Sequence, residues 1–261
     1  MAVKPKLGQN FLRDQQAIQR IASALGDLST RTVVEIGPGK GAITEELAAR
    51  AKHLIVVELD RVLASALRLR FSQTTVTVNQ NDVLQFDFAE AAKQAGQPLL
   101  VAGNLPYYIT SPILLRLAAQ STSLERAVLM VQREVADRIT ASPGSRDYGL
   151  LTVTLQLYGT TEPLFTLPPD AFSPPPDVHS TVFLWNFAPR FAELQVKEAP
   201  FIAFLKQAFA LKRKTLVNSL RAVGRDPRQI SEVLVALGLP ALIRAEALSL
   251  DQLAALWRSL E

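Results

Sequence analysis

The most constraining feature of the sequence is a regular alternation of short apolar runs and amphipathic segments along residues 32–140. Runs of strand length, such as Thr-Val-Val-Glu-Ile at 32–36, are each followed by a segment with helical spacing of apolar residues. Such alternation predicts a parallel β-sheet with helices on both faces. We expect strands at 32–37, 53–60, 75–82, 98–106 and 126–131, and helices at 14–25, 42–51, 61–71, 88–96, 111–120 and after 131.

The alternation stops after Tyr148. Residues 150–169 and 179–187 are predicted as strands with no helix between them, forming an antiparallel edge on the sheet. From 201 onward the spacing is helical, with helices expected at 201–224, 226–239 and 248–260. The sequence therefore predicts two domains, an α/β domain at 1–186 and a small all-helical domain at 187–261.

Composition excludes several classes of site. The chain has no cysteine, so it can hold neither disulfides nor thiolate metal sites, and its two histidines are too few for a histidine-based metal centre. No apolar stretch reaches the length of a membrane helix, and no apolar run follows the charged N-terminal residues as a secretory signal would require. We expect a cytoplasmic protein that acts as a monomer, without a metal or a membrane.

The positive charge is concentrated near the C-terminus. The net charge is +4, and the excess of basic over acidic residues lies entirely in 186–261. A polyanionic partner would bind such a patch, although a solvated helix face explains a basic run about equally well. The basic residues that would contact such a partner are Lys212, Arg213, Lys214 and Arg221.

A glycine-rich loop, Gly-Pro-Gly-Lys-Gly at 37–41, lies between a predicted strand and a predicted helix. Its spacing differs from the dinucleotide fingerprint, and a carboxylate precedes it, which disfavours a pyrophosphate. S-adenosylmethionine carries a sulfonium and an ammonium, so a site of acids and carbonyls favours it. Glu58 and Asp82 end the next two strands, where they can accept hydrogen bonds from ribose hydroxyls and from the adenine amine.

The fourth strand ends in Asn-Leu-Pro-Tyr-Tyr at 104–108. An exocyclic adenine amine is a poor nucleophile, because its lone pair is delocalised into the ring. Hydrogen bonds from that amine to the Asn104 side chain and the Leu105 carbonyl would favour a tetrahedral nitrogen, and Tyr107 offers a ring for the base. An ordinary proline turn with core tyrosines is the structural alternative.

These motifs strongly resemble those of the ribosomal RNA adenine dimethyltransferases, in particular the branch that modifies the small subunit. The resemblance covers nearly the whole chain, and its segments are 6–12, 33–44, 56–60, 103–108, 132–139, 143–151, 173–182 and 209–220. It implies a Rossmann-like class I methyltransferase fold, S-adenosylmethionine as cofactor, and dimethylation of adjacent adenines in small-subunit ribosomal RNA, with a part in subunit assembly.

The resemblance also implies roles for individual residues. Asn10 and Leu12 would close over the cofactor. Phe172 would be a second stacking ring for the target adenine, with a core aromatic as a nearly equal alternative. The basic residues that would contact RNA are Lys212, Arg213, Lys214 and Arg221. The remaining cofactor-lining residues would be Gly37, Gly39, Glu58, Asp82 and Asn104.

Three other functions remain open from the sequence. One is the large-subunit branch of the same family, associated with macrolide resistance. Another is a non-catalytic nucleic-acid-binding protein built on the same scaffold. The third is a small-molecule methyltransferase, which the basic C-terminal segment disfavours.

Overall fold

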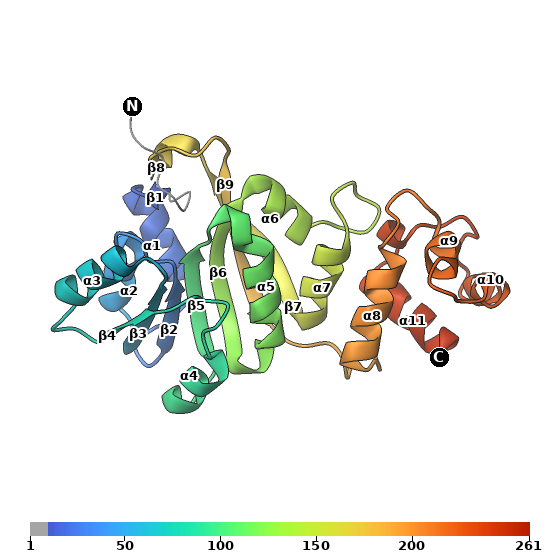
Figure 1. Ribbon diagram of the computed structural model, residues 1–261, viewed down its shortest axis with the longest axis horizontal. Helices are drawn as coiled ribbons and strands as arrows, with labels where there is room; N and C mark the ends of the chain where they lie inside the picture. Colours follow the sequence, from blue (N-terminus) through green and yellow to red (C-terminus); the bar gives the residue numbers. More distant parts are fainter. Residues whose placement is uncertain (1–9) are drawn as a thin grey trace. The chain divides into compact units, whose positions relative to one another are not determined.

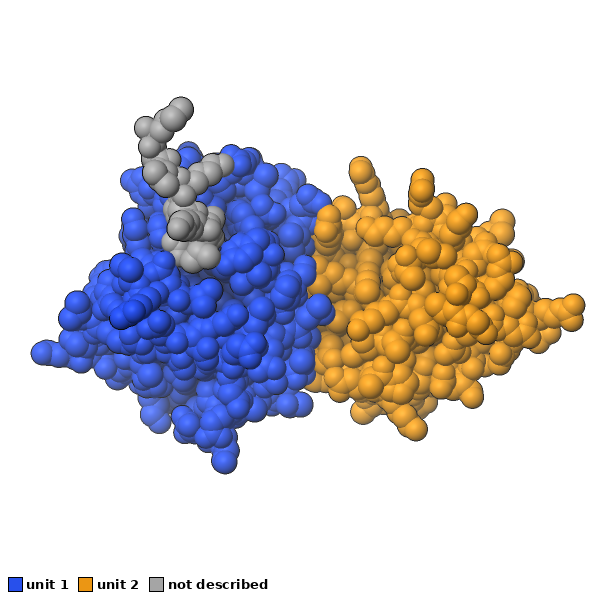
Figure 2. Space-filling model, viewed as in Figure 1, with its two compact units in different colours: residues 1–136, 160–188 blue, residues 137–159, 189–261 orange. Residues whose placement is uncertain are grey.

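The computed structural model describes residues 10–261, so positions 6–9 of the first family-like motif lie outside the described residues. The chain forms two compact units, residues 1–136 with 160–188, and residues 137–159 with 189–261 (Figure 2). The last passage between them, after residue 188, lies close to the expected boundary. The contribution of 137–159 to the second unit was not expected from the sequence.

A seven-stranded sheet forms the first unit, in the order β4-β3-β2-β5-β6-β9-β7 (Figure 1). The neighbouring strands β4, β3, β2, β5 and β6 all run parallel. Strand β9 pairs antiparallel with β6, which confirms the antiparallel edge predicted for 179–187. The strands are β2 Thr32–Ile36, β3 His53–Glu58, β4 Val76–Gln80, β5 Leu99–Asn104, β6 Leu124–Gln132, β7 Gly159–Leu167 and β9 Ser180–Phe187. A separate ribbon pairs β1 Phe11–Leu12 with β8 Phe172–Ser173.

The helices of the first unit begin where the sequence places capping residues. The carboxylates of Asp14, Asp60 and Asp87 each accept a hydrogen bond from an amide of the first turn that follows, which satisfies donors the helix leaves unpaired. The helices are α1 Gln15–Ala24, α2 Ala42–Ala48, α3 Arg61–Arg70, α4 Phe88–Ala95 and α5 Thr110–Ala119. These agree with the helices predicted from apolar spacing.

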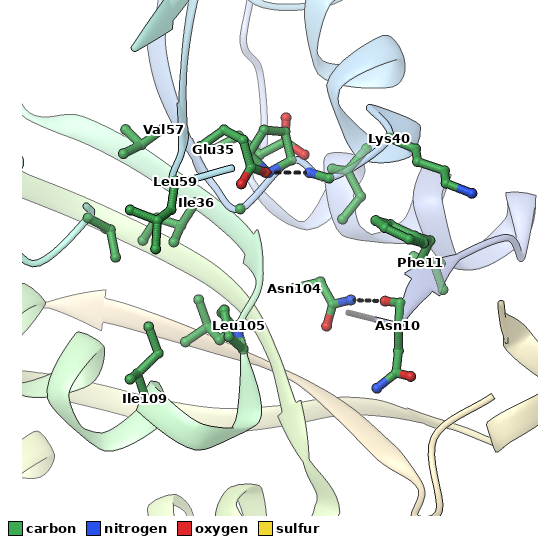
Figure 3. Close-up of a pocket in the computed structure, with 18 of the residues that line it drawn as sticks. Asn10, Phe11, Glu35, Ile36, Lys40, Val57, Leu59, Asn104, Leu105 and Ile109 are labelled. Carbon is green, nitrogen blue, oxygen red and sulfur yellow. Dashed lines mark hydrogen bonds between the residues drawn. The ribbon is translucent and has the colours of Figure 1, made fainter. Parts of the chain in front are cut away.

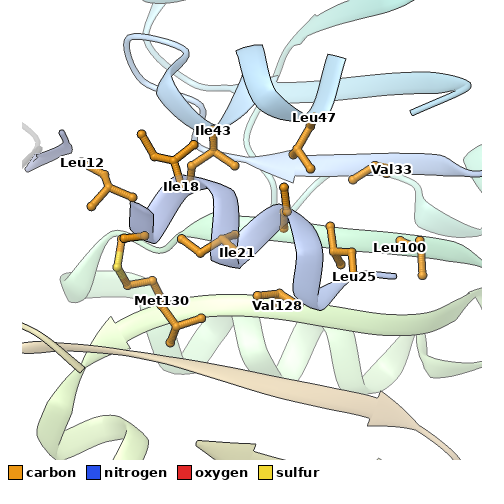
Figure 4. Packing of buried hydrophobic residues seen from close by; sticks show 14 of the residues in the cluster. Leu12, Ile18, Ile21, Leu25, Val33, Ile43, Leu47, Leu100, Val128 and Met130 are labelled. Carbon is orange, nitrogen blue, oxygen red and sulfur yellow. The ribbon is translucent and has the colours of Figure 1, made fainter. Parts of the chain in front are cut away.

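One face of the sheet packs against α1 and α2 (Figure 4). Side chains alternate along a strand, so Val33, Leu100 and Val128 lie on this face and meet Ile18 and Ile21 of α1. All five are at most 2% exposed. Complete burial of side chains this large stabilises a domain by roughly 1.5–3 kcal/mol each, which holds the strand ends in fixed positions.

The second unit is helical, with α7 Leu150–Tyr158, α8 Glu198–Ala208, α9 Leu216–Arg221, α10 Pro227–Ala236 and α11 Leu250–Leu260; α6 Arg133–Ile139 spans the passage into it. The strand predicted at 150–158 was wrong, because this segment is α7. Its side chains are buried on nearly every side, including Val153 and Leu157. A continuous apolar run of this kind shows neither helical nor strand periodicity, so the sequence pattern cannot distinguish the two.

The single helix predicted at 201–224 was also wrong, because the chain forms α8 and α9 with a turn between them. The Thr215 hydroxyl accepts a hydrogen bond from the Asn218 amide and starts the second helix. Leu205 and Leu216 are buried, but Leu211 lies in the turn and is 41% exposed. The basic run at 212–214 is therefore presented on a turn and not on a helix face.

Candidate cofactor and substrate site

A cavity in the first unit opens at the carboxyl ends of the parallel strands (Figure 3). This edge includes the junction of β2 and β5, where the strand order reverses, which is where open α/β sheets bind ligands. All residues predicted to bind the cofactor line the cavity, namely Asn10, Leu12, Gly37, Gly39, Glu58, Asp82 and Asn104. The fold thus brings together side chains from four strand ends and the β1 ribbon.

The loop after β2 approaches the Phe11 ring closely at Gly39. Gly39 has φ +58°, and a Cβ built there would lie 2.8 Å from a ring carbon of Phe11. Only glycine combines this backbone conformation with such an approach at low cost. The Gly39 amide donates to Glu58 Oε2 at 3.1 Å, which ties the loop to the end of β3.

Glu58 is 4% exposed, and its two carboxylate oxygens accept from the Gly39 and Asp60 amides. Burial raises the pKa of Glu58, and the two amide hydrogen bonds oppose that shift. Each carboxylate oxygen has a further lone pair, so the group can still accept hydroxyl donors from a ligand.

Glu35, at 1% exposure, is the second buried acid of the cavity. Burial raises the pKa of Glu35 to about 8; the Thr44 hydroxyl opposes the shift and the Glu58 carboxylate adds to it. Within residues 10–261, its Oε2 atom has no hydrogen-bond partner. A buried carboxyl with an unused acceptor favours a ligand that brings donors or positive charge into the cavity.

Asp82 follows β4 and lies in a turn that its own side chain stabilises. Its Oδ1 atom accepts from the Leu84 amide at 2.9 Å, and the Asn81 side chain accepts from the Asp82 amide at 2.8 Å. Asp82 also lines the cavity, so it stabilises its own turn and is exposed to a ligand at the same time.

Asn104 ends β5, and its side chain is oriented by the ribbon that carries Asn10. Asn104 Nδ2 donates to the Asn10 carbonyl at 2.9 Å (Figure 3). No hydrogen bond within the described residues reaches Asn104 Oδ1, so the acceptor end of the amide remains available. This orientation is the one required to accept a hydrogen bond from an amine.

Leu105 and Tyr107 are held by contacts with β6 and β9. The Leu105 amide donates to the Met130 carbonyl of β6 at 3.0 Å, while its side chain is 1% exposed. The Tyr107 hydroxyl and the Ser180 hydroxyl lie 2.6 Å apart, which fixes the ring. Burial raises the pKa of Tyr107, and the Ser180 hydrogen bond partly opposes this shift.

The structure does not bring Phe172 to the cavity. Its side chain is 2% exposed and belongs to the apolar cluster on the α1 face of the sheet. Phe172 instead pairs with Leu12 in the β1–β8 ribbon. The ring offers no free face to a base in this structure, because burying an aromatic side chain in the core is strongly favourable. The stacking role implied by the resemblance would require the ring to leave the core.

Several residues of the cavity were not predicted from the sequence, among them Phe11, Leu59, Asn81 and Tyr108. Phe11 and Asn81 stand beside predicted site residues, which is the one sequence signal that could have identified them. Tyr108 is 59% exposed.

In the second unit, the four basic residues expected to contact RNA are all exposed. Lys212, Arg213 and Lys214 lie in the turn between α8 and α9, and Arg221 ends α9. Within residues 10–261 none of the four forms an ion pair. Arg225, by contrast, pairs with Glu261 at 3.1 Å. The four exposed cations are therefore available to a phosphate.

Within residues 10–261, no group of three or more histidine, aspartate or glutamate side chains is arranged to hold a metal ion. No helix in this part of the chain is both long and apolar enough to cross a bilayer.

Comparison with known proteins is consistent with this geometry. Residues 1–253 match the family described as Ribosomal RNA adenine dimethylase. A protein of Acidobacterium capsulatum named Ribosomal RNA small subunit methyltransferase A is 58% identical over 99% of this chain and 91% of its own length. A protein of the same name from Koribacter versatilis is 51% identical over 99% and 95%.

Among solved structures, the 23S rRNA methyltransferase ErmE is 26% identical, with a TM-score of 0.74 over 96% of this chain and 99% of its own. A dimethyladenosine transferase from Plasmodium falciparum, 23% identical, shares the fold with a TM-score of 0.79 over 94% and 95%. The sheet order, the cavity and these matches agree: the chain belongs to the ribosomal RNA adenine dimethylase family, with the α/β fold of class I methyltransferases.

Proposed function

We propose that the protein transfers methyl groups from S-adenosylmethionine to the exocyclic amine of adjacent adenines in small-subunit ribosomal RNA, giving dimethyladenosine. The observation that carries the proposal is the orientation of Asn104. Its Nδ2 atom is held by the Asn10 carbonyl, so its Oδ1 atom is left to accept from the target amine. The Tyr107 ring, fixed through Ser180, lines the same cavity.

The hydrogen-bond acceptors that line the cavity fit the chemistry of the cofactor. Bound there, S-adenosylmethionine would supply a methyl group on a positively charged sulfur. Glu58 would accept from its ribose hydroxyls and Asp82 from its adenine amine, and the Gly37–Gly39 segment would allow close backbone approach. Asn10 and Leu12 would cover it from the β1 ribbon. The unused Oε2 atom of Glu35 would add an acceptor for a donor of the bound cofactor.

The residues of this chain activate the amine by position. Hydrogen bonds from the amine to Asn104 Oδ1 and to the Leu105 carbonyl favour a tetrahedral nitrogen, whose lone pair is no longer shared with the ring. Tyr107 would stack on the base and hold it in line with the methyl group. No strong base is required, because the proton can leave once the new bond has formed.

RNA recognition is assigned to the second unit. The phosphates of RNA would be contacted by Lys212, Arg213, Lys214 and Arg221. Within the described part of the chain, these exposed cations have no ion pair to break when they bind a phosphate. In this proposal the protein works as a cytoplasmic monomer and contributes to small-subunit assembly.

The choice of the small subunit rests on the curated relatives. The two relatives named above as small-subunit methyltransferases are 58% and 51% identical to this chain, whereas the 23S rRNA methyltransferase ErmE is 26% identical. Two alternatives remain for the methyl-transfer experiment to detect. One is activity on the large subunit, and the other is nucleic-acid binding without catalysis.

The test is transfer of a labelled methyl group to three substrates, namely undermethylated small subunits, mature small subunits and large subunits. We expect label only in the first, recovered as dimethyladenosine on mass spectrometry of digested RNA. The Asn104→Ala variant should lose about two to three orders of magnitude in rate, as for removal of one well-placed polar contact at a reacting group. The Asn104→Asp variant retains an acceptor and should keep partial activity.

Two results would contradict the proposal. Label in large subunits would move the chain to the other branch, and methylated guanine or cytosine would mean that the pocket accepts a different base. Full activity in Asn104→Ala, with cofactor affinity unchanged, would remove Asn104 from the reaction.

A further inference from the structure

Tyr108 has an unusual environment for an aromatic residue of this protein. Of the tyrosine, phenylalanine and tryptophan side chains in residues 10–261, it is the one that is largely exposed, at 59%. It lines the same cavity as Asn104 and Tyr107. An exposed ring normally carries a cost in unburied apolar surface, so an aromatic at the rim of a binding cavity is a candidate contact for the ligand.

The backbone under Tyr108 is rigid. Tyr107–Ile109 form a short 3₁₀ helix that leads directly into α5. The Ile109 amide and the Thr110 hydroxyl both donate to the Pro106 carbonyl, at 3.2 and 3.1 Å. Proline fixes its own φ, here −60°. A ring on such a turn is positioned before the ligand arrives, which lowers the entropy lost on binding.

The rings of Tyr107 and Tyr108 cannot both stack on the same face of one base. Adjacent residues of a 3₁₀ helix point about 120° apart, because the helix has three residues per turn. Tyr107 is directed to Ser180 of β9, where the two hydroxyls lie 2.6 Å apart. Tyr108 makes no hydrogen bond or ring contact with the other described residues. The two rings therefore diverge from neighbouring positions at one cavity.

We infer that Tyr108 forms a second stacking subsite, which binds the base of a nucleotide next to the target adenine. This inference rests on the proposed function, because it takes the target base to occupy the Tyr107 ring. Stacking is tolerant of base identity, since every base has a flat π face. The subsite would therefore position the strand beside the target and add affinity for RNA, without touching the reacting amine.

The test uses a short RNA that contains the two adjacent adenines, with the fluorescent base 2-aminopurine placed on either side of the target. Wild-type protein should quench 2-aminopurine at one of these positions. Tyr108→Ala should abolish the quenching and weaken RNA binding by about 5- to 150-fold, the loss expected for one base–aromatic stack. Tyr108→Phe keeps the ring and should retain both properties.

Leu115→Ala is the matched control, because Leu115 is an exposed apolar residue on α5 that does not line the cavity. It should behave as wild type. In methyl transfer, Tyr108→Ala should raise the KM for RNA and leave kcat at saturating RNA, and the affinity for S-adenosylmethionine, near wild-type values. A merely structural role would lower cofactor affinity or thermal stability as well.

The outcomes separate the two proposals. If wild-type protein methylates the RNA but Tyr108→Ala binds and quenches as well as wild type, the subsite is disproved and the proposed function stands. If Tyr108→Phe is as defective as Tyr108→Ala, the hydroxyl and not the ring makes the contact, which also overturns the inference. If wild-type protein methylates neither this RNA nor undermethylated small subunits, the proposed function fails first and the subsite with it.

Discussion

At the scale of single residues, the cavity contains two buried acids with different surroundings. Glu58 has both oxygens occupied by backbone amides, whereas Glu35 keeps an oxygen with no partner within residues 10–261. The same burial therefore has a larger consequence at Glu35, whose pKa it raises to about 8. Because the pKa of Glu35 differs between the folded and unfolded states, the free energy of unfolding of the ligand-free protein depends on pH.

The sign of the dependence follows from proton binding. Between the ordinary glutamate pKa of about 4.3 and the raised value, the folded protein binds more protons than the unfolded chain, so stability falls as pH rises through this window. The Glu35→Gln variant removes the titrating group and should gain stability relative to wild type between pH 5.5 and 7.5, by up to about 1.4 kcal/mol per pH unit.

Urea unfolding at several pH values measures this difference. Glu162→Gln, at an exposed position on β7, serves as the control and should show no comparable trend. A difference between Glu35→Gln and wild type that stays constant with pH would mean that Glu35 is ionised throughout the range.

At the scale of elements, the loop between β2 and α2 and the ribbon β1–β8 depend on each other. Gly39 lies against Phe11 of β1, and β8 holds β1 through the pairing of Phe172 with Leu12. Lys40 Nζ also lies 4.7 Å from the centre of the Phe11 ring. A Cβ at position 39 would lie 2.8 Å from a Phe11 ring carbon, so a larger residue there should displace Phe11 from the side of the cavity that it lines.

Gly39→Ala tests this dependence, with Gly96→Ala as its matched control. Both glycines have positive φ, +58° and +68°, but a Cβ at Gly96 meets nothing within 4 Å. Each variant should lose about 1–2 kcal/mol of stability from backbone strain. Only Gly39→Ala should also displace Phe11, so calorimetry should show weakened binding of S-adenosylmethionine in that variant alone. Equal cofactor affinity in the two variants would show that the contact with Phe11 does not matter for binding.

At the scale of the whole molecule, the two compact units carry different charges and different proposed tasks. The cavity lies entirely in the first unit, and the exposed basic turn at 212–214 lies in the second. Because the excess positive charge is confined to 186–261, affinity for RNA should depend on this part of the chain, while cofactor affinity should not.

Replacing Lys212, Arg213 and Lys214 with alanine should weaken binding to small subunits and reduce its salt dependence by about two to three units of slope. S-adenosylmethionine affinity should be unchanged. The control replaces Lys52, Arg61 and Lys93, three exposed cations of the first unit, and removes the same net charge. If both triple variants lose the same salt dependence, net charge and not a local contact governs binding.

Much of the first unit and its site could be predicted from the sequence, because the signals there are local. Alternating apolar runs determine the parallel strands, and aspartates at 14, 60 and 87 start three helices. Residues that follow strand ends must meet at one edge of a parallel sheet, which is why Gly37, Glu58, Asp82 and Asn104 were predicted to share a cavity.

Tertiary structure decided the rest, since it depends on what surrounds a segment. Residues 150–158 are a helix because their neighbours bury them on nearly all sides, which erases the periodicity that identifies a helix. Phe172 lies in the core, while Tyr108 is exposed at the cavity, although both are aromatic residues next to prolines or turns. The sequence by itself determined which strand ends meet at the site, and only packing decided which side chains line it and remain available to a ligand.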